Sequence, residues 1–123
     1  MTKFTAYGFV FITIVFTIFG QLVIKWQASM AGVPPEDWRG RAQFLYAIAI
    51  NPWIVCGLFS AVIAAVAWIL AMTKLPINVA YPLVALTFPC VVVLSHVLFG
   101  EELTLLRLIG IALIVVGVSI VNL

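Results

Sequence analysis

Four long runs of apolar residues, almost free of charge, constrain this chain more than any other feature. They cover about residues 4–24, 53–72, 76–99 and 105–123. An α-helix rises about 1.5 Å per residue, so a run of roughly 20 residues crosses the hydrocarbon core of a bilayer. A soluble domain of this size cannot bury the surface of a chain that is 66% hydrophobic. We therefore predict an all-α integral membrane protein, a four-transmembrane-helix bundle forming a single domain over residues 1–123.

The connections between the runs differ in length. Residues 73–76 and 100–104 are short enough only for tight turns between antiparallel helices. The first connection, about residues 30–50, is longer, and its apolar residues recur at helical spacing from Trp38 onward. This pattern predicts either a short helix lying at the membrane interface or an extension of the second run.

The composition argues against several functional classes. The basic residues are scattered, whereas nucleic-acid binding requires a clustered basic face. Cys56 and Cys90 lie in apolar runs and His96 is the single histidine, so neither a metal cluster nor a catalytic triad can be assembled. We expect no cofactor, no metal, no nucleic-acid partner and no enzymatic activity.

Polar residues recur every four positions in the first run. Thr13, Thr17, Gln21 and Lys25 therefore share one side of a helix, and we call them the polar ridge. Two interpretations are open. In the first, the threonines bond to their own backbone and Lys25 is an interface anchor that extends to the headgroup region. In the second, Lys25 binds an anionic head group, most naturally a phosphate.

Two prolines lie seven residues apart in the third run. Pro82 and Pro89 each remove a helical hydrogen bond, which releases the carbonyls of Asn78 and Ala85. Membrane helices tolerate such kinks where the freed backbone faces a protected cavity. The polar side chains that we expect to line such a cavity are Asn78 and Tyr81.

Two glycines lie seven residues apart in the fourth run. Gly110 and Gly117 share a helix face on which a second backbone can approach closely. Four helices leave little room for a polar pathway within one subunit. These features predict a dimer that packs through this face.

Carboxylates precede the fourth run. Glu101 and Glu102 lie at its start, with Thr104 as the expected N-cap and Arg107 one turn inside. Acidic groups near a helix start are favoured by the helix dipole. A solvated cap and a contact with a cationic substrate group are both open for these two glutamates.

Four segments together resemble the small multidrug resistance family within the drug/metabolite transporter superfamily. They are "GQLVIK" at residues 20–25, "LPINVAYPLVAL" at 75–86, "FGEEL" at 99–103 and "GIALIVVG" at 110–117. The last is similar to the glycine motif through which that family dimerises. The resemblance covers nearly the whole chain and implies four spans in each subunit of a dimer.

The chain departs from the drug-exporting branch of that family. The membrane-embedded glutamate of that branch, eight residues before the lysine, is replaced by Thr17, and its cation-binding aromatic by Val84. "GQL" before Lys25 and "AYP" at residues 80–82 look instead like aminoarabinose–undecaprenyl-phosphate flippase subunits. The resemblance implies a transporter of the bacterial inner membrane that moves a polyprenyl-phosphate-linked sugar for lipopolysaccharide modification.

The resemblance also implies roles for individual residues. Lys25 is the phosphate candidate, and the weaker ones are Arg39, Arg41 and Arg107. Gln21, Thr17, Asn78 and Tyr81 are expected to hydrogen-bond the head group, and Glu101 or Glu102 to meet an amino group of the sugar. The expected partners are this lipid substrate, membrane lipids and a second copy or a similar small subunit.

Two other functions are open. One is export of small cationic drugs or metabolites, with Glu101 or Glu102 coupling transport to protons. The other is a non-transporting membrane partner of a glycosyltransferase.

Overall fold

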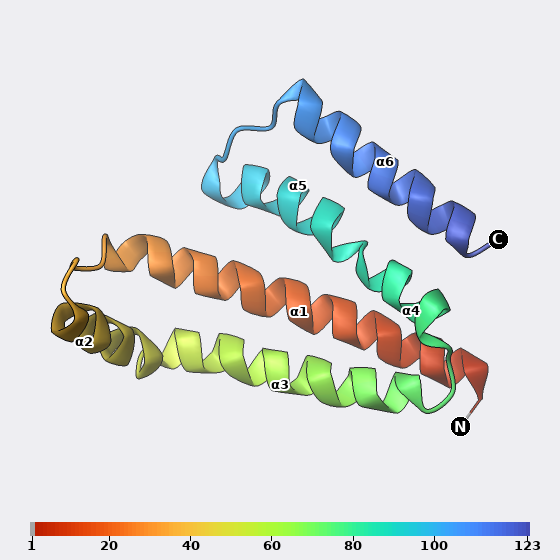
Figure 1. Ribbon diagram of the computed structural model, residues 1–123, viewed down its shortest axis with the longest axis horizontal. Helices are drawn as coiled ribbons and strands as arrows, with labels where there is room; N and C mark the ends of the chain where they lie inside the picture. The colour runs from red at the N-terminus through yellow and green to blue at the C-terminus, as the bar shows by residue number, and fades with distance from the viewer. Residues whose placement is uncertain (1) are drawn as a thin grey trace.

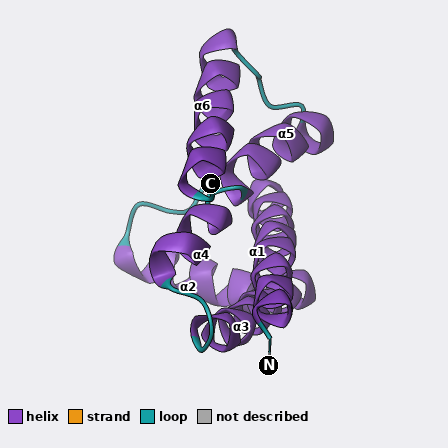
Figure 2. Cartoon of the chain, turned by 90° about the vertical axis from the view of Figure 1, so that its right-hand side faces the viewer, coloured by secondary structure: helices purple, strands orange, loops and turns teal. Residues whose placement is uncertain are grey.

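The computed structural model describes residues 2–123, and within that range the regular structure is entirely helical. α1 and α3 lie side by side and antiparallel. α4 and α5 run alongside α1, and α6 is the outermost helix (Figures 1 and 2). The predicted all-α class is confirmed. The helices are α1 (Lys3–Ala31), α2 (Trp38–Ala49), α3 (Pro52–Met72), α4 (Ile77–Val84), α5 (Thr87–Phe99) and α6 (Leu105–Val121).

Three helical stretches are long and apolar enough to cross a membrane. They are α1, α3 and the stretch Ile77–Phe99, which contains both α4 and α5. The chain is therefore a multi-pass membrane protein. α6 is also apolar but has only 17 residues, and the fourth span stays a prediction.

α1 is longer than the apolar run that predicted it. It continues past residue 24 to Ala31 and stops at Gly32, whose φ of 86° favours glycine. The polar residues at this end do not break the helix, because hydropathy marks the membrane boundary and not the helix end. Asn51 holds this end to α3: its Nδ2 donates to Oε1 of the buried Gln27 at 3.1 Å, and its Oδ1 accepts from the Trp53 N–H.

The first connection contains a separate helix. α2 begins at Trp38, capped by Asp37, whose carboxylate accepts from the Gly40 N–H at 3.0 Å. It ends at Ala49, and Pro52 starts α3. α2 is therefore a short helix separate from α3, and its place at the membrane interface stays a prediction.

α1 and α3 cross at a pair of glycines. A Cβ atom built on Gly20 would lie 2.9 Å from the Gly57 carbonyl oxygen, so only glycine fits there without a shift of the backbone. A polar contact within the membrane-length part also joins the helices: the Thr13 hydroxyl lies 3.2 Å from the Ala64 carbonyl. Close backbone approach of this kind is how spanning helices associate without a hydrophobic driving force.

The third predicted span is divided. Ala85 and Leu86 form a turn between α4 and α5. Pro89 has no N–H to donate to the Ala85 carbonyl, which instead accepts from the Phe88 N–H at 3.1 Å. Pro82 lies inside α4 without ending it. The interruption therefore lies between the two prolines.

α6 packs against α4 and α5 and leaves most of its surface open. Its start is the predicted one, because the Thr104 hydroxyl accepts from the Arg107 N–H at 3.3 Å as an N-cap. A Cβ atom built on Gly110 or Gly117 meets nothing within 4 Å. The glycine face of α6 is therefore uncovered in the single chain.

Candidate functional site

α1, α3 and α4 enclose a cleft of about 310 Å³. Thr13, Thr17 and Gln21 line it from α1, Trp68 from α3 and Tyr81 from α4. The first three members of the polar ridge thus face one space, because their four-residue spacing keeps them on one side of the helix. The cleft lies within the membrane-length part of the helices.

The threonines of this cleft differ in their hydrogen bonds. The Thr13 hydroxyl lies 2.9 Å from the Phe9 carbonyl and 3.2 Å from that of Ala64, so it is satisfied by backbone. The side chains of Thr17 and Gln21 have no hydrogen-bond partner among residues 2–123. Polar groups without partners are costly in an apolar solvent. Thr17 and Gln21 are therefore free to bind a polar ligand.

Sequence reasoning missed the α3 wall of the cleft. Gly57, Ala61, Ala64 and Trp68 all line it. Their spacing puts them on one helix face, and a stripe of small residues that ends at a tryptophan was the available signal. The Trp68 and Tyr81 rings meet edge to face with centroids 6.1 Å apart, which closes the cleft between α3 and α4.

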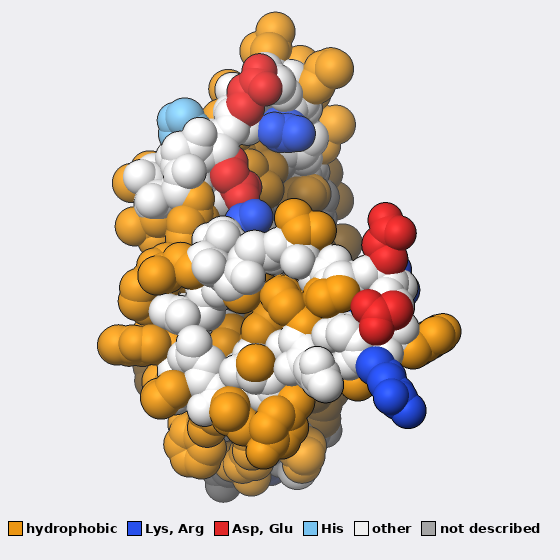
Figure 3. Space-filling model, turned by 90° about the vertical axis from the view of Figure 1, so that its left-hand side faces the viewer, with side chains coloured by type: hydrophobic (Ala, Val, Ile, Leu, Met, Phe, Trp, Pro, Cys, Tyr) orange, Lys and Arg blue, Asp and Glu red, His pale blue; other side chains and the backbone are white. Residues whose placement is uncertain are grey.

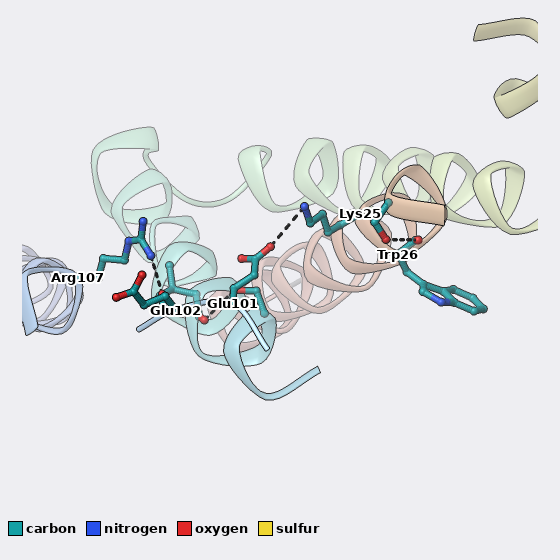
Figure 4. A network of polar contacts seen from close by, with 8 residues as sticks. Lys25, Trp26, Glu101, Glu102 and Arg107 are labelled. Carbon is teal, nitrogen blue, oxygen red and sulfur yellow. Dashed lines mark hydrogen bonds and ion pairs between the residues drawn. The ribbon is translucent and has the colours of Figure 1, made fainter. Parts of the chain in front are cut away.

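Lys25, the last residue of the polar ridge, lies one turn beyond Gln21 and outside the cleft lining. Its Nζ is 3.4 Å from Oε1 of Glu101, which follows α5 (Figure 4). The two side chains remain 53% and 43% exposed, so a ligand can reach both. This ion pair joins α1 to the connection between α5 and α6.

Arg107 and Glu102 form a neighbouring contact. Arg107 Nη1 donates to the Glu102 carbonyl oxygen at 2.6 Å (Figure 4). Both residues line a second, more polar pocket of about 410 Å³, together with Ser95 and Glu101. Glu101 therefore stands between this pocket and Lys25, whereas Glu102 faces Arg107.

Three further predicted site residues belong neither to the cleft lining nor to the contacts around Glu101. Arg39 and Arg41 belong to α2, and the Arg41 Nε donates to the Pro35 carbonyl at 3.0 Å. Asn78 is exposed near the start of α4 and is not among the residues that line the cleft with Tyr81, so its role in the site stays a prediction. Asn78 and Tyr81 lie at different depths along the bundle. Asn78 is one turn nearer to one end of the bundle, the end at which Ala80 packs in an apolar cluster.

Charges gather at one end of the helices, which we call the charged end (Figure 3). It carries Lys25 and the α5–α6 connection, with α2 beside it (Figure 1). All four acidic residues and four of the six basic residues of the chain lie there, so the charges balance. An anion is therefore attracted by individual cations and not by a basic surface. The basic residues at this end are Lys25, Arg39, Arg41 and Arg107, and those at the opposite end are Lys3 and Lys74.

Comparison with known proteins agrees with these features. The profile of the EamA-like transporter family matches residues 1–123. A relative from Pectobacterium atrosepticum, a probable 4-amino-4-deoxy-L-arabinose-phosphoundecaprenol flippase subunit ArnE, is 33% identical over 117 residues, covering 95% of this chain and 97% of the relative. The corresponding probable subunit ArnF of Yersinia enterocolitica is 30% identical over 121 residues, covering 94% and 92%.

A probable ArnE subunit from Pseudomonas fluorescens is 28% identical over 87 residues, covering 71% of this chain and 76% of the relative. No solved structure matches the chain significantly. The resemblance to flippase subunits is confirmed, and it rests on sequence over nearly the full length.

Proposed function

Because the chain belongs to the EamA-like transporter family, we propose that it is a flippase subunit that moves an undecaprenyl-phosphate-linked aminosugar across the bacterial inner membrane. The names of its ArnE and ArnF relatives support this substrate. Those relatives are membrane transporter subunits and not enzymes. The proposal assigns the head group of the lipid to the cleft and its phosphate to Lys25.

One observation carries the proposal. Thr17 and Gln21 lack hydrogen-bond partners in the described chain and lead along one helix face to Lys25. A sugar offers several hydroxyl groups to such side chains, and a phosphate offers oxygens to an ammonium group. Tyr81 supplies a further hydroxyl across the cleft. The arrangement matches a phosphosugar better than an apolar cation.

The lining also argues against export of cations. In the drug-exporting branch a glutamate occupies the position of Thr17, whereas the lining of this cleft contains no carboxylate among residues 2–123. A cationic substrate would have no counter-charge there. An anionic lipid would find its counter-charge at Lys25, at the edge of the membrane where a charge costs least.

The size of the cleft limits what enters it. A volume of about 310 Å³ is at the small end of ligand sites, about 300–1,000 Å³. It suits one sugar ring and leaves no room for a polyprenyl chain. An apolar groove between α1 and α5 begins beside Lys25, and we assign the first isoprene units to it. Its lining is Phe19, Leu22, Val23, Trp26, Leu98 and Phe99.

The proposal includes the assembly. We propose a single domain with four spans, of which α6 is the fourth, since 17 residues reach the lower end of the spanning range of about 17–25. The uncovered face at Gly110 and Gly117 supports a dimer through α6. Relatives that carry two different subunit names support pairing with a similar small subunit as well as with a second copy.

Lipid transfer between leaflets tests the function. The full chain is reconstituted in liposomes, alone or with a second small subunit of its family, and movement of a polyprenyl phosphosugar is measured. We expect Lys25→Gln to slow transfer at least about tenfold, because a charge-assisted hydrogen bond contributes about 1.5–3 kcal/mol.

Lys74→Gln is the matched control, since it removes the same charge at the opposite end of the helices. We expect it to transfer lipid at the wild-type rate. Equal rates for Lys25→Gln and the wild type would remove Lys25 from the site. If the wild-type protein transfers no lipid, either alone or with the second small subunit, the proposed function is contradicted.

A further inference from the structure

The carboxylate of Glu101, which is paired with Lys25, affects which ligands Lys25 can bind. Lys25 is already paired with Glu101 at 3.4 Å. A phosphate that binds Lys25 either displaces this carboxylate or shares the ammonium group with it. In both cases the phosphate and Glu101 lie close together, and like charges repel. An anion alone therefore binds against a penalty that arises from Glu101.

The backbone of Glu101 is held by contacts on both sides. Gly100 ends α5 with a φ of 68°, a left-handed conformation that fixes the direction of the chain. The Glu101 carbonyl is 2.7 Å from His96 Nδ1, which ties the backbone to α5. On the other side, Arg107 binds the Glu102 carbonyl. The backbone of Glu101 is thus held on both sides, in a position from which its carboxylate reaches Lys25 (Figure 4).

A ligand with both charges removes the penalty. We propose that the Lys25–Glu101 pair selects zwitterionic lipid phosphates, and that binding exchanges one ion pair for two. The phosphate takes Lys25, and an ammonium group on the sugar takes Glu101. Each protein charge keeps a partner, and the α5–α6 connection stays joined to α1 through the ligand. This inference rests on the proposed function and adds a specificity residue to it.

Two lipids that differ in one charge test the exchange. One is a short-chain polyprenyl phosphosugar with a free amine, and the other is the same lipid with that amine acetylated. They compete for the full-length protein in detergent, and native mass spectrometry measures the occupancy of each. We expect the wild type to prefer the amine by about tenfold or more, the value of one charge-assisted hydrogen bond.

Variants identify the residue. Glu101→Gln is expected to lose the preference, because the amine then meets no charge. Glu101→Asp keeps the carboxylate and is expected to retain the preference, which separates a charge effect from a folding defect. Glu36→Gln removes a negative charge from the loop before α2, on the same end of the molecule, and is expected to leave the preference unchanged.

The outcomes separate the two proposals. Equal binding of both lipids by the wild type, with binding of both lost in Lys25→Gln, overturns the selection by Glu101 and leaves the proposed function standing. A preference that persists in Glu101→Gln also overturns the inference. Failure of the wild type to bind either lipid overturns the proposed function and the inference with it.

Discussion

The crossing of α1 and α3 gives a quantitative prediction at Gly20. In Gly20→Ala the new methyl group would lie 2.9 Å from the Gly57 carbonyl oxygen, whereas ordinary contacts begin near 3.4 Å. The neighbour is backbone and cannot rotate away. The helices must therefore separate by roughly half an ångström, and such overpacking costs about 1–3 kcal/mol. The higher helix propensity of alanine offsets about 1 kcal/mol, which leaves a net loss of up to about 2 kcal/mol.

Two further substitutions make the prediction graded. In Gly57→Ala the nearest atom is Ile24 Cγ1 at 3.1 Å, a side-chain atom that can shift, so we expect a smaller loss. Gly8 lies in the same helix with nothing within 4 Å of an added Cβ atom. Gly8→Ala is therefore the control and should be as stable as the wild type or slightly more so.

Unfolding in mixed micelles of a mild detergent and SDS measures these differences. The Trp26 and Trp53 rings meet across α1 and α3 with centroids 5.3 Å apart, so tryptophan fluorescence reports when the two helices separate. The expected order of unfolding free energies is Gly20→Ala below Gly57→Ala below Gly8→Ala. If Gly20→Ala is as stable as Gly8→Ala, the two backbones do not approach as closely as described here.

Two other substitutions test the ends of the molecule and its outer face. Asn51→Ala removes the α3 cap and leaves the buried Gln27 amide unpaired, so we expect a loss of about 1–3 kcal/mol of unfolding free energy. Gln43→Ala, on the exposed face of α2, is its control, and equal stability of the two would contradict the role of the pair. Gly110→Val is expected to lower the fraction of cross-linked dimer in liposome-reconstituted protein. Gly8→Val, at a position equally free of neighbours in one chain, is expected to leave this fraction unchanged. An unchanged dimer fraction in Gly110→Val argues against pairing through α6.

The spacing of residues predicted which helix face a side chain occupies, but it did not predict the level of that side chain along the bundle. The first three residues of the polar ridge face one cleft because four residues make about one helical turn. Asn78 and Tyr81 were predicted together as the polar side chains near the proline kinks, and they lie three residues apart. Only Tyr81 lines the cleft, because Asn78 lies one turn nearer the end of the bundle. Periodicity says which way a side chain points and not what fills the space at its level.

Contacts between distant segments were beyond sequence reasoning. Lys25 and Glu101 were each predicted as candidate binding residues, but nothing in the sequence around either residue indicates that they pair. Their contact depends on how the turn at Ala85 and Leu86 directs α5 along α1. The extension of α1 to Ala31 was missed for another reason: the run of apolar residues ends where the membrane interface is expected, while the helix continues.

The layering of the helices separates assembly from binding. α6 packs on α4 and α5 (Figure 2), whereas the cleft is lined by α1, α3 and α4 and by no residue of α6. We therefore expect a partner subunit that covers Gly110 and Gly117 to leave the cleft uncovered. If lipid binds in this cleft as proposed, we expect binding to require one subunit and passage through the membrane to require the second, since the cleft of about 310 Å³ spans only part of the helices. On this reasoning a variant that dissociates the dimer keeps the preference for the amine and loses lipid transfer, and loss of both together would place the partner at the cleft.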